Sequence, residues 1–163
     1  MALWDLRGKA VGLLVAAAVV GFGAVSLYQR MREATLEVNS VPGGAEVVLA
    51  ARTAARAEKL AQRLGCRTVE WSGRHNISAD ILVNGTPVGM HPNVDETPYE
   101  RHYLKPSMIV FDTVYNPEST LLVKEARARS CVVVTGVEMF VRQAALQFKL
   151  FTQQEPPTAL MRD

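Results

Sequence analysis

Short apolar runs alternate with longer segments of helical periodicity from residue 43 onward. Each run is rich in β-branched residues and is bounded by Gly, Pro or Asn, which is typical of strands. The expected strands are AEVVLA (45–50), RTVEW (67–71), ADILVNG (79–85), SMIVFDTVY (107–115) and CVVVTG (131–136). Strands that alternate with helices predict a parallel sheet with crossover connections on both faces. We therefore expect an α/β fold with a doubly wound, mainly parallel sheet.

Three segments predict the intervening helices. RTAARAEKLAQRLG has Thr53 as its expected N-cap and ends at Gly65. PESTLLVKEARARS has Pro117 at its start. GVEMFVRQAALQFKLF spans residues 136–151. Its apolar positions recur at helical spacing and therefore favour a side that faces the core. These positions are Phe140, Ala144, Phe148 and Phe151.

The segment Ala10–Leu27 allows two interpretations. It is uncharged throughout, so its length fits a membrane span, but its Ala and Gly content makes it only weakly apolar. A buried strand that runs into a buried helix gives the same pattern. We favour folded core in a cytoplasmic protein, with a membrane anchor through residues 10–27 as the alternative.

The composition is that of a globular domain. The 163 residues are 48% hydrophobic and 21% charged, unlike those of a disordered chain. A formal net charge of +2 without a dense basic run argues against a nucleic-acid partner. Cys66 and Cys131 show no disulfide-type spacing, and the three histidines have no metal-ligand spacing. We expect reduced thiols and no metal site.

The loop NGTPVGMHPNVDETP (84–98) directly follows a predicted buried strand. In doubly wound sheets, ligands lie at the carboxyl ends of the strands. Asn84 and Thr86 offer side-chain hydrogen bonds there, and the glycines let backbone approach a ligand closely. An ordinary surface loop remains the alternative.

The end of the strand AEVVLA, which follows the first helix of the expected sheet, favours NADP over NAD. An NAD site usually has an acidic residue here for the ribose 2′-hydroxyl, but the sequence reads LAART. Arg52 and Arg56 instead stand at a predicted helix start, where guanidinium groups suit a 2′-phosphate. A pair of solvated arginines is the alternative.

The start of the last helix carries a methionine and a glutamine on one face. Met139 and Gln143 are four residues apart and follow the strand CVVVTG, so they would face the strand-end cleft. Met139 is suited to pack on a nicotinamide ring, and Gln143 to bond a polyol.

Four ordered motifs resemble the NADP-binding domain of shikimate dehydrogenases. They are NGTPVGMHPNVDETP, VFDTVYNPESTLL, GVEMFVRQAALQFKLFT and PPTALMR, and they cover about residues 44–163. GMHPNVDETP and EMFVRQA are most similar to the bifunctional 3-dehydroquinate dehydratase/shikimate dehydrogenase type. The resemblance implies a Rossmann-like fold and hydride transfer between NADPH and 3-dehydroshikimate.

The resemblance also implies roles for individual residues. The residues expected to hold the adenosine 2′-phosphate are Arg52, Thr53 and Arg56. Those expected to line the nicotinamide half are Asn84, Thr86, Pro87, Thr113, Gly136 and Met139. Tyr115 and Gln143 are expected to contact the substrate.

The N-terminal segment departs from this family. AAAVVGFGAV replaces the family's glycine-rich pyrophosphate turn, so the first strand–turn–helix unit is atypical. We expect a divergent segment over residues 1–42 and the NADP-binding domain over residues 43–163. The substrate domain, with the family's lysine and aspartate, is expected to be absent, so no catalytic residue is assigned. Shikimate or 3-dehydroshikimate would bind only if that domain is supplied. The alternative is a truncated or decayed, non-catalytic nucleotide-binding domain.

Overall fold

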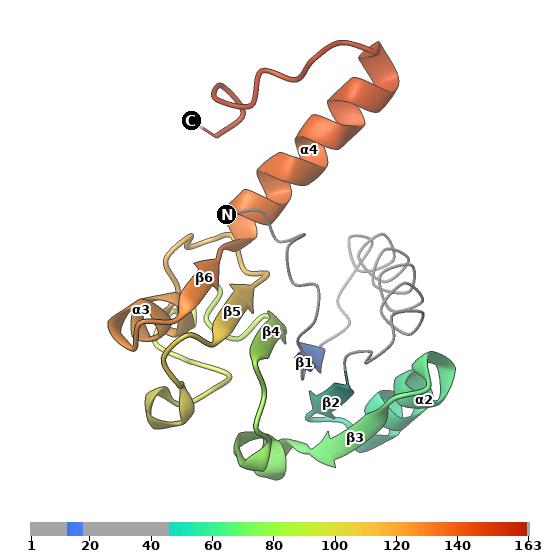
Figure 1. The fold of residues 1–163 in the computed structure, drawn as a ribbon, viewed down its shortest axis with the longest axis vertical. Coiled ribbons are helices and arrows are strands. Elements are labelled where there is room, and N and C mark those ends of the chain that lie inside the picture. The colour runs from blue at the N-terminus through green and yellow to red at the C-terminus, as the bar shows by residue number, and fades with distance from the viewer. Residues whose placement is uncertain (1–12, 18–45, 163) are drawn as a thin grey trace. The chain divides into compact units, whose positions relative to one another are not determined.

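The computed structural model describes residues 13–17 and 46–162 (Figure 1). The chain divides into two compact units, residues 1–82 and 83–163. The sequence AAAVVGFGAV (16–25), which replaces the family's glycine-rich turn, lies outside the described residues from position 18 onward, as does most of the predicted segment 1–42.

The described part of the first unit contains parallel strands with a helix beside them. Its elements are β1 (Leu13–Ala17), β2 (Val47–Ala51), α2 (Ala54–Leu64), β3 (Arg67–Glu70) and the 3₁₀ helix η1 (Trp71–Asn76). The strands lie in the order β3-β2-β1, and both pairings are parallel. The middle strand β2 is buried at Val48, Leu49 and Ala50, because α2 contacts β2 and β3 (Figure 1).

Helix α2 has the ends that the sequence predicts. Thr53 is its N-cap, although the Thr53 side chain makes no capping hydrogen bond. Gly65 ends it in the left-handed conformation, with φ of 67°. This conformation is accessible to glycine at little cost. The small side chains of Ala57 and Ala61 form its buried face.

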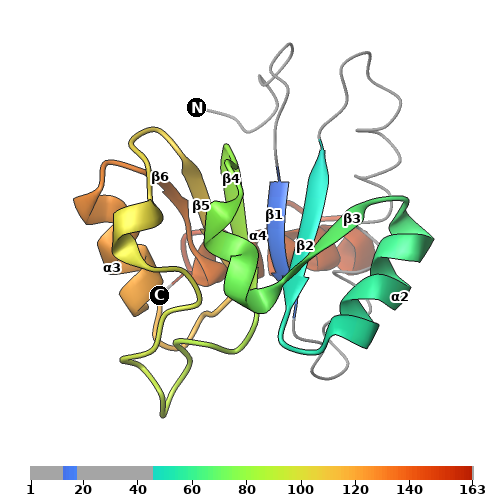
Figure 2. The same cartoon turned by 90° about the horizontal axis from the view of Figure 1, so that it is seen from below.

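The second unit repeats the strand–helix pattern. Its elements are β4 (Ile81–Gly85), which begins just before the unit boundary, η2 (Arg101–Tyr103), β5 (Ile109–Asp112), α3 (Leu121–Ala128), β6 (Val132–Val134) and α4 (Gly136–Thr152). The strands follow one another as β4-β5-β6, with β5 and β6 parallel (Figure 2). Val110, Leu122 and Val123 are fully or almost fully buried, because α3 contacts β5 and β6. The expected strands and helices are therefore confirmed.

Helix α3 begins later than its expected position. Pro117 lies in the loop before the helix, and Thr120 is the N-cap. The Thr120 hydroxyl accepts a hydrogen bond from the Val123 amide at 3.2 Å, which satisfies a donor of the first helical turn. A side-chain cap, rather than the proline, therefore fixes the start of α3.

The expected burial of the apolar stripe on α4 is wrong for Phe140 and Phe151, whereas Ala144 and Phe148 are partly buried. Phe140 is 57% exposed and Phe151 is 81% exposed, while Gly136 and Ala145 are the buried positions of the helix. Phe151 is exposed because α4 extends away from the end of β6, so that its last turns lie far from β5 and β6 (Figure 1). Helical spacing identifies an apolar side but not what covers it.

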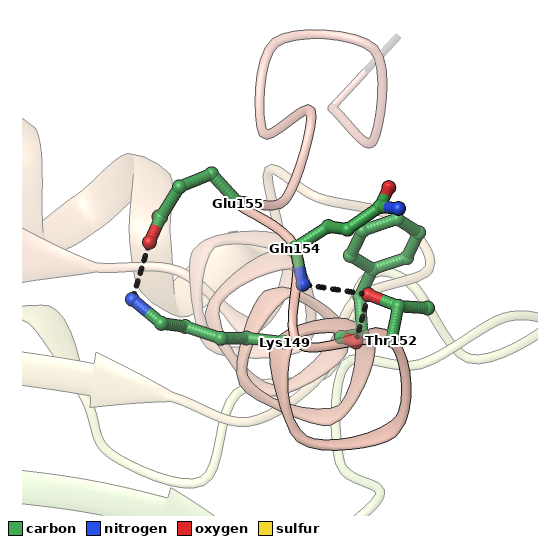
Figure 3. Close-up of polar contacts among 5 residues, drawn as sticks. Lys149, Thr152, Gln154 and Glu155 are labelled. Atoms are coloured by element: carbon green, nitrogen blue, oxygen red, sulfur yellow. Dashed lines mark hydrogen bonds and ion pairs between the residues drawn. The ribbon is translucent and has the colours of Figure 1, made fainter.

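The end of α4 is closed by local polar contacts (Figure 3). The Thr152 hydroxyl donates to the Phe148 carbonyl at 2.8 Å and accepts from the Gln154 amide at 3.1 Å. Lys149 forms an ion pair with Glu155 just beyond the helix. These contacts use the carbonyl end of the helix, where a positive side chain is favourable.

Five residues of the uncharged segment 10–27 are described, and they form strand β1, which pairs with β2. The rest of the segment lies outside the described residues. In the part of the chain that the structure covers, no helix has the length and apolar character of a membrane span.

Gly136 makes the closest approach between α4 and the loop that follows β5. A Cβ atom at this position would lie 2.3 Å from the Val114 carbonyl oxygen and 2.7 Å from that of Thr113. Both contacts are with backbone, which cannot rotate away as a side chain can.

We expect Gly136→Ala to lower the free energy of unfolding by about 1–3 kcal/mol or more, because α4 or the loop must shift. Gly73→Ala is a suitable control, since a Cβ there meets nothing within 4 Å. It should stay within about 0.5 kcal/mol of the wild type. Urea denaturation measures both, and equal stability of the two variants would contradict the close-packing role of Gly136.

Candidate functional site

Asn84 organises the turn at the carboxyl end of β4. Its side chain is fully buried, and its Oδ1 accepts from the Thr86 amide at 3.0 Å and from the Thr86 hydroxyl at 2.7 Å. Its Nδ2 donates to the Val88 carbonyl at 3.3 Å and to Asp112 Oδ1 at 2.9 Å. The Asn84 amide group is thus occupied by protein partners, and it shapes the turn instead of facing outward.

Thr86 continues this arrangement along the Gly85–Gly89 turn. Its hydroxyl also accepts from the Val88 amide at 3.2 Å, so both hydrogen-bonding functions of the hydroxyl are used. Gly89 is buried with φ of 89°, a conformation that disfavours any other residue. These contacts, together with Pro87, restrict the shapes that the turn can adopt.

Asp112 lies at the centre of the same cluster, at the last position of β5. Its fully buried carboxylate accepts from the Val114 amide at 3.0 Å and from the Thr120 hydroxyl at 2.6 Å, in addition to Asn84. Burial raises the pKa of Asp112, and the hydrogen bonds from Thr120, Val114 and Asn84 oppose that shift. The sequence motifs did not single out Asp112, although an acidic residue at the end of an apolar strand, IVFD, could have indicated it.

Thr113, Pro87 and Gly136, which are also expected at the nicotinamide half, lie in the second unit and contact protein backbone there. Both the amide and the hydroxyl of Thr113 donate to the Asn84 carbonyl, at 3.0 and 2.8 Å. Pro87 is half-buried, and its carbonyl accepts from the Met90 amide at 3.1 Å. Gly136 is buried against the loop after β5, so its contacts are structural.

Met139 and Gln143 lie in the first half of α4, and both are partly exposed. Tyr115, in the loop after β5, is 58% exposed, and its ring stacks on Phe140 with centroids 5.8 Å apart. This contact brings the two expected substrate-contacting segments, the Tyr115 loop and the start of α4, next to each other.

The remaining expected residues belong to the first unit. Arg52, Thr53 and Arg56 are all exposed at the point where β2 leads into α2. The first turn of α2 has no acidic residue, and Thr53 does not cap it with its side chain. Within the described part of the chain, neither arginine side chain forms an ion pair with a carboxylate.

The described residues contain no cluster of three potential metal ligands. Cys66 and Cys131 are free thiols, and burial raises the pKa of each. A raised pKa keeps a thiol protonated and therefore less nucleophilic.

Several known dehydrogenases match the chain in sequence and fold. The family model described as the shikimate 5′-dehydrogenase C-terminal domain matches residues 136–163. The chain is 42% identical over 120 residues to the chloroplastic bifunctional 3-dehydroquinate dehydratase/shikimate dehydrogenase of Arabidopsis thaliana. That alignment covers 72% of this chain and 20% of the plant enzyme.

Two solved structures extend the match. Quinate dehydrogenase from Corynebacterium glutamicum, in complex with NAD, is 30% identical, with a TM-score of 0.74 over 96% of this chain and 55% of that one. Shikimate 5-dehydrogenase from Thermus thermophilus, in complex with NADP(H) and shikimate, is 31% identical, with a TM-score of 0.71 over 92% of this chain and 52% of that one. This chain thus spans about half the length of these two relatives.

Parallel strands with intervening helices, and a polar cluster at the strand ends, define a Rossmann-like α/β domain. The matches agree on its family: the chain belongs to the shikimate dehydrogenases and corresponds to their C-terminal domain. The resemblance seen in the sequence and the expected fold class are both confirmed.

The raised pKa of Asp112 predicts how stability varies with pH. The folded state holds the Asp112 proton more tightly than the unfolded state does, so the neutral form contributes stability at low pH. That contribution is lost as pH rises from the ordinary Asp pKa of about 3.9 through the raised folded value. We expect the stability of the wild type, relative to Asp112→Asn, to fall with pH over this window and then level off. Urea denaturation of both proteins across the acidic range measures it; a difference that is constant, or that rises with pH, would contradict the assignment.

Proposed function

We propose that this chain is the NADP-binding part of a shikimate dehydrogenase, which moves a hydride between NADPH and the carbonyl carbon of 3-dehydroshikimate. Its family membership supports this, as does the solved relative that holds NADP(H) and shikimate. Because the chain spans about half of that relative, the whole reaction is proposed for a protein that also includes a substrate domain. We take residues 43–163 as the NADP-binding domain and residues 1–42 as a divergent segment.

The arrangement at the start of α2 carries the preference for NADP. Arg52 and Arg56 place two positive charges beside a helix N-terminus, which itself has positive character. Both side chains are exposed, so an anion bound there would interact favourably with the two guanidinium groups and with the helix N-terminus. A 2′-phosphate supplies that anion and accepts charge-assisted bonds from both guanidinium groups, and the uncapped Thr53 hydroxyl can donate a third. Because the quinate dehydrogenase relative was solved with NAD, the preference for NADP has to be measured for this chain itself.

The second unit offers groups suited to the nicotinamide half. The Gly85–Gly89 turn has a fixed shape, since the Thr86 and Val88 amides donate to side chains of the same segment. Met139, partly exposed near the start of α4, provides a polarizable thioether that packs well on a ring. In this proposal these residues form one side of the nicotinamide site. Asn84, Thr86 and Thr113 fix its shape by their hydrogen bonds, while Pro87 and Gly136 restrict its backbone conformation.

The proposed substrate contacts are Tyr115 and Gln143. The Tyr115 ring is held against Phe140 while more than half of its surface stays accessible, so its hydroxyl can bond a polyol. Gln143 offers both a donor and an acceptor from the same helix. No residue of this chain is assigned to proton transfer.

The other candidate is a nucleotide-binding domain without catalysis. The five lysines of the sequence lie in no motif that resembles the family's catalytic one. A measurement of turnover, separate from one of binding, distinguishes the two candidates.

The cofactor preference is tested with 2′-phospho-AMP and AMP, which do not require a pyrophosphate turn. Charge-assisted hydrogen bonds contribute about 1.5–3 kcal/mol each, so the wild type should prefer 2′-phospho-AMP by roughly 10²-fold after screening. Arg52→Ala should erase most of this preference and leave AMP binding almost unchanged. Titration calorimetry measures all four affinities.

Lys59→Ala is the matched control, because Lys59 is an exposed cation on the same helix, away from its N-terminus. It should keep the preference for 2′-phospho-AMP. Equal affinity of the wild type for both fragments, or an equal loss in both variants, would mean that Arg52 is solvated surface.

A polypeptide of these 163 residues alone should show no measurable oxidation of shikimate with NADP. General acid–base catalysis is worth roughly 10²- to 10⁴-fold, and the binding contributed by a substrate domain would be missing as well. The measurement is the formation of NADPH by absorbance, with a full-length family member as the positive control. Clear turnover by the pure polypeptide would show that it supplies its own catalytic group.

A further inference from the structure

Asp112 determines which way the Asn84 amide points. An ionised carboxylate only accepts hydrogen bonds, so the Asn84 group facing Asp112 Oδ1, 2.9 Å away, has to be the NH₂ donor. Asn84 Oδ1 is then directed to the opposite side, where it accepts from both the amide and the hydroxyl of Thr86. The acceptor needed by the turn is therefore presented because Asp112 holds the other end of the amide.

The same carboxylate ties three segments of the second unit together. Asn84 belongs to the end of β4, Val114 to the loop after β5, and Thr120 to the N-cap of α3. Since Asp112 and Asn84 are each 0% exposed, water does not compete for these bonds. A change at Asp112 is thereby transmitted to the turn through one buried side chain.

We propose that Asp112 is a positioning residue for the cofactor site: acting through Asn84, it fixes the Gly85–Gly89 turn in the shape that receives the nicotinamide half. This inference rests on the proposed function, since it takes that turn as one side of the nicotinamide site. It concerns a residue that the sequence motifs do not assign to the site. Asp112 itself is buried and touches neither cofactor nor substrate in this proposal.

Asp112→Asn is the informative substitution because it keeps the shape and removes the charge. Its oxygen can remain toward Asn84 and Val114, and its NH₂ group can donate to the Thr120 hydroxyl in place of the lost acceptor. The bond from Asn84 then becomes a neutral one, which is roughly half as strong. The Asn84 amide should be held less strongly in its orientation, and the turn should open more often.

The first measurement is hydrogen exchange of the Thr86 and Val88 amides, which donate to Asn84 Oδ1 and Thr86 Oγ1. In Asp112→Asn both amides should exchange about fivefold faster, as expected when a charge-assisted hydrogen bond becomes a neutral one. Amides in the middle of α4 serve as the internal reference, because a general loss of stability would accelerate them equally.

The second measurement compares the dissociation constants of NADP and 2′-phospho-AMP by calorimetry. Asp112→Asn should raise the dissociation constant of NADP about five- to tenfold and leave that of 2′-phospho-AMP within about twofold, because only NADP has a nicotinamide half. Asp95→Asn is the matched control: it removes an exposed carboxylate from the same long loop and should change neither constant.

Selective weakening of NADP together with faster exchange in the turn supports the proposal. Equal weakening of both ligands, or no weakening of either, overturns it while the proposed function stands. Failure of the wild type to bind 2′-phospho-AMP overturns the proposed function first, and this inference with it.

If Asp112→Asn does not fold, two Thr86 variants test the same connection. Thr86→Ser keeps the hydroxyl that donates to Asn84, whereas Thr86→Val removes it at similar volume. Thr86→Ser should retain more NADP affinity than Thr86→Val, with 2′-phospho-AMP again the reference. Equal NADP affinity of these two variants would overturn the proposal.

Discussion

The second unit depends on one buried carboxylate and on the donors that surround it. Asp112 ends β5 in a fully buried position, where an unpaired charge would cost several kcal/mol. Donors from Asn84, Val114 and Thr120 offset part of that cost, and each comes from a different segment. Because all three donors bind the same carboxylate, they hold the end of β4, the loop after β5 and the start of α3 in one mutual arrangement.

Close backbone contact is the second constraint on this unit. Gly136 lets the start of α4 lie against the carbonyls of Thr113 and Val114, and Thr113 in turn donates to the Asn84 carbonyl. The start of α4, which carries Met139 and Gln143, is thus fixed relative to the same polar cluster. In the last turn of α4, by contrast, Phe151 is 81% exposed.

The first unit has a different kind of constraint, one of charge. Buried β2 and the alanine face of α2 are ordinary strand–helix packing. The positive groups Arg52 and Arg56 nevertheless stand at the helix end where positive charge is least favourable. The proposed preference for NADP rests on that placement, because a bound phosphate would interact favourably with both guanidinium groups.

The sequence by itself determined the strands, the helices, the family and the position of the two arginines. Those features depend on local periodicity, on Gly65 in a left-handed cap and on motifs that are contiguous in the chain. The tertiary structure alone decided that Asn84 is fully occupied, that Asp112 is its partner and that Phe140 is exposed. Asn84 and Asp112 are 28 residues apart, and the stripe on α4 looks the same whether or not anything covers it. Hydrogen-bond partners and burial arise from contacts distant in sequence, which no local pattern encodes.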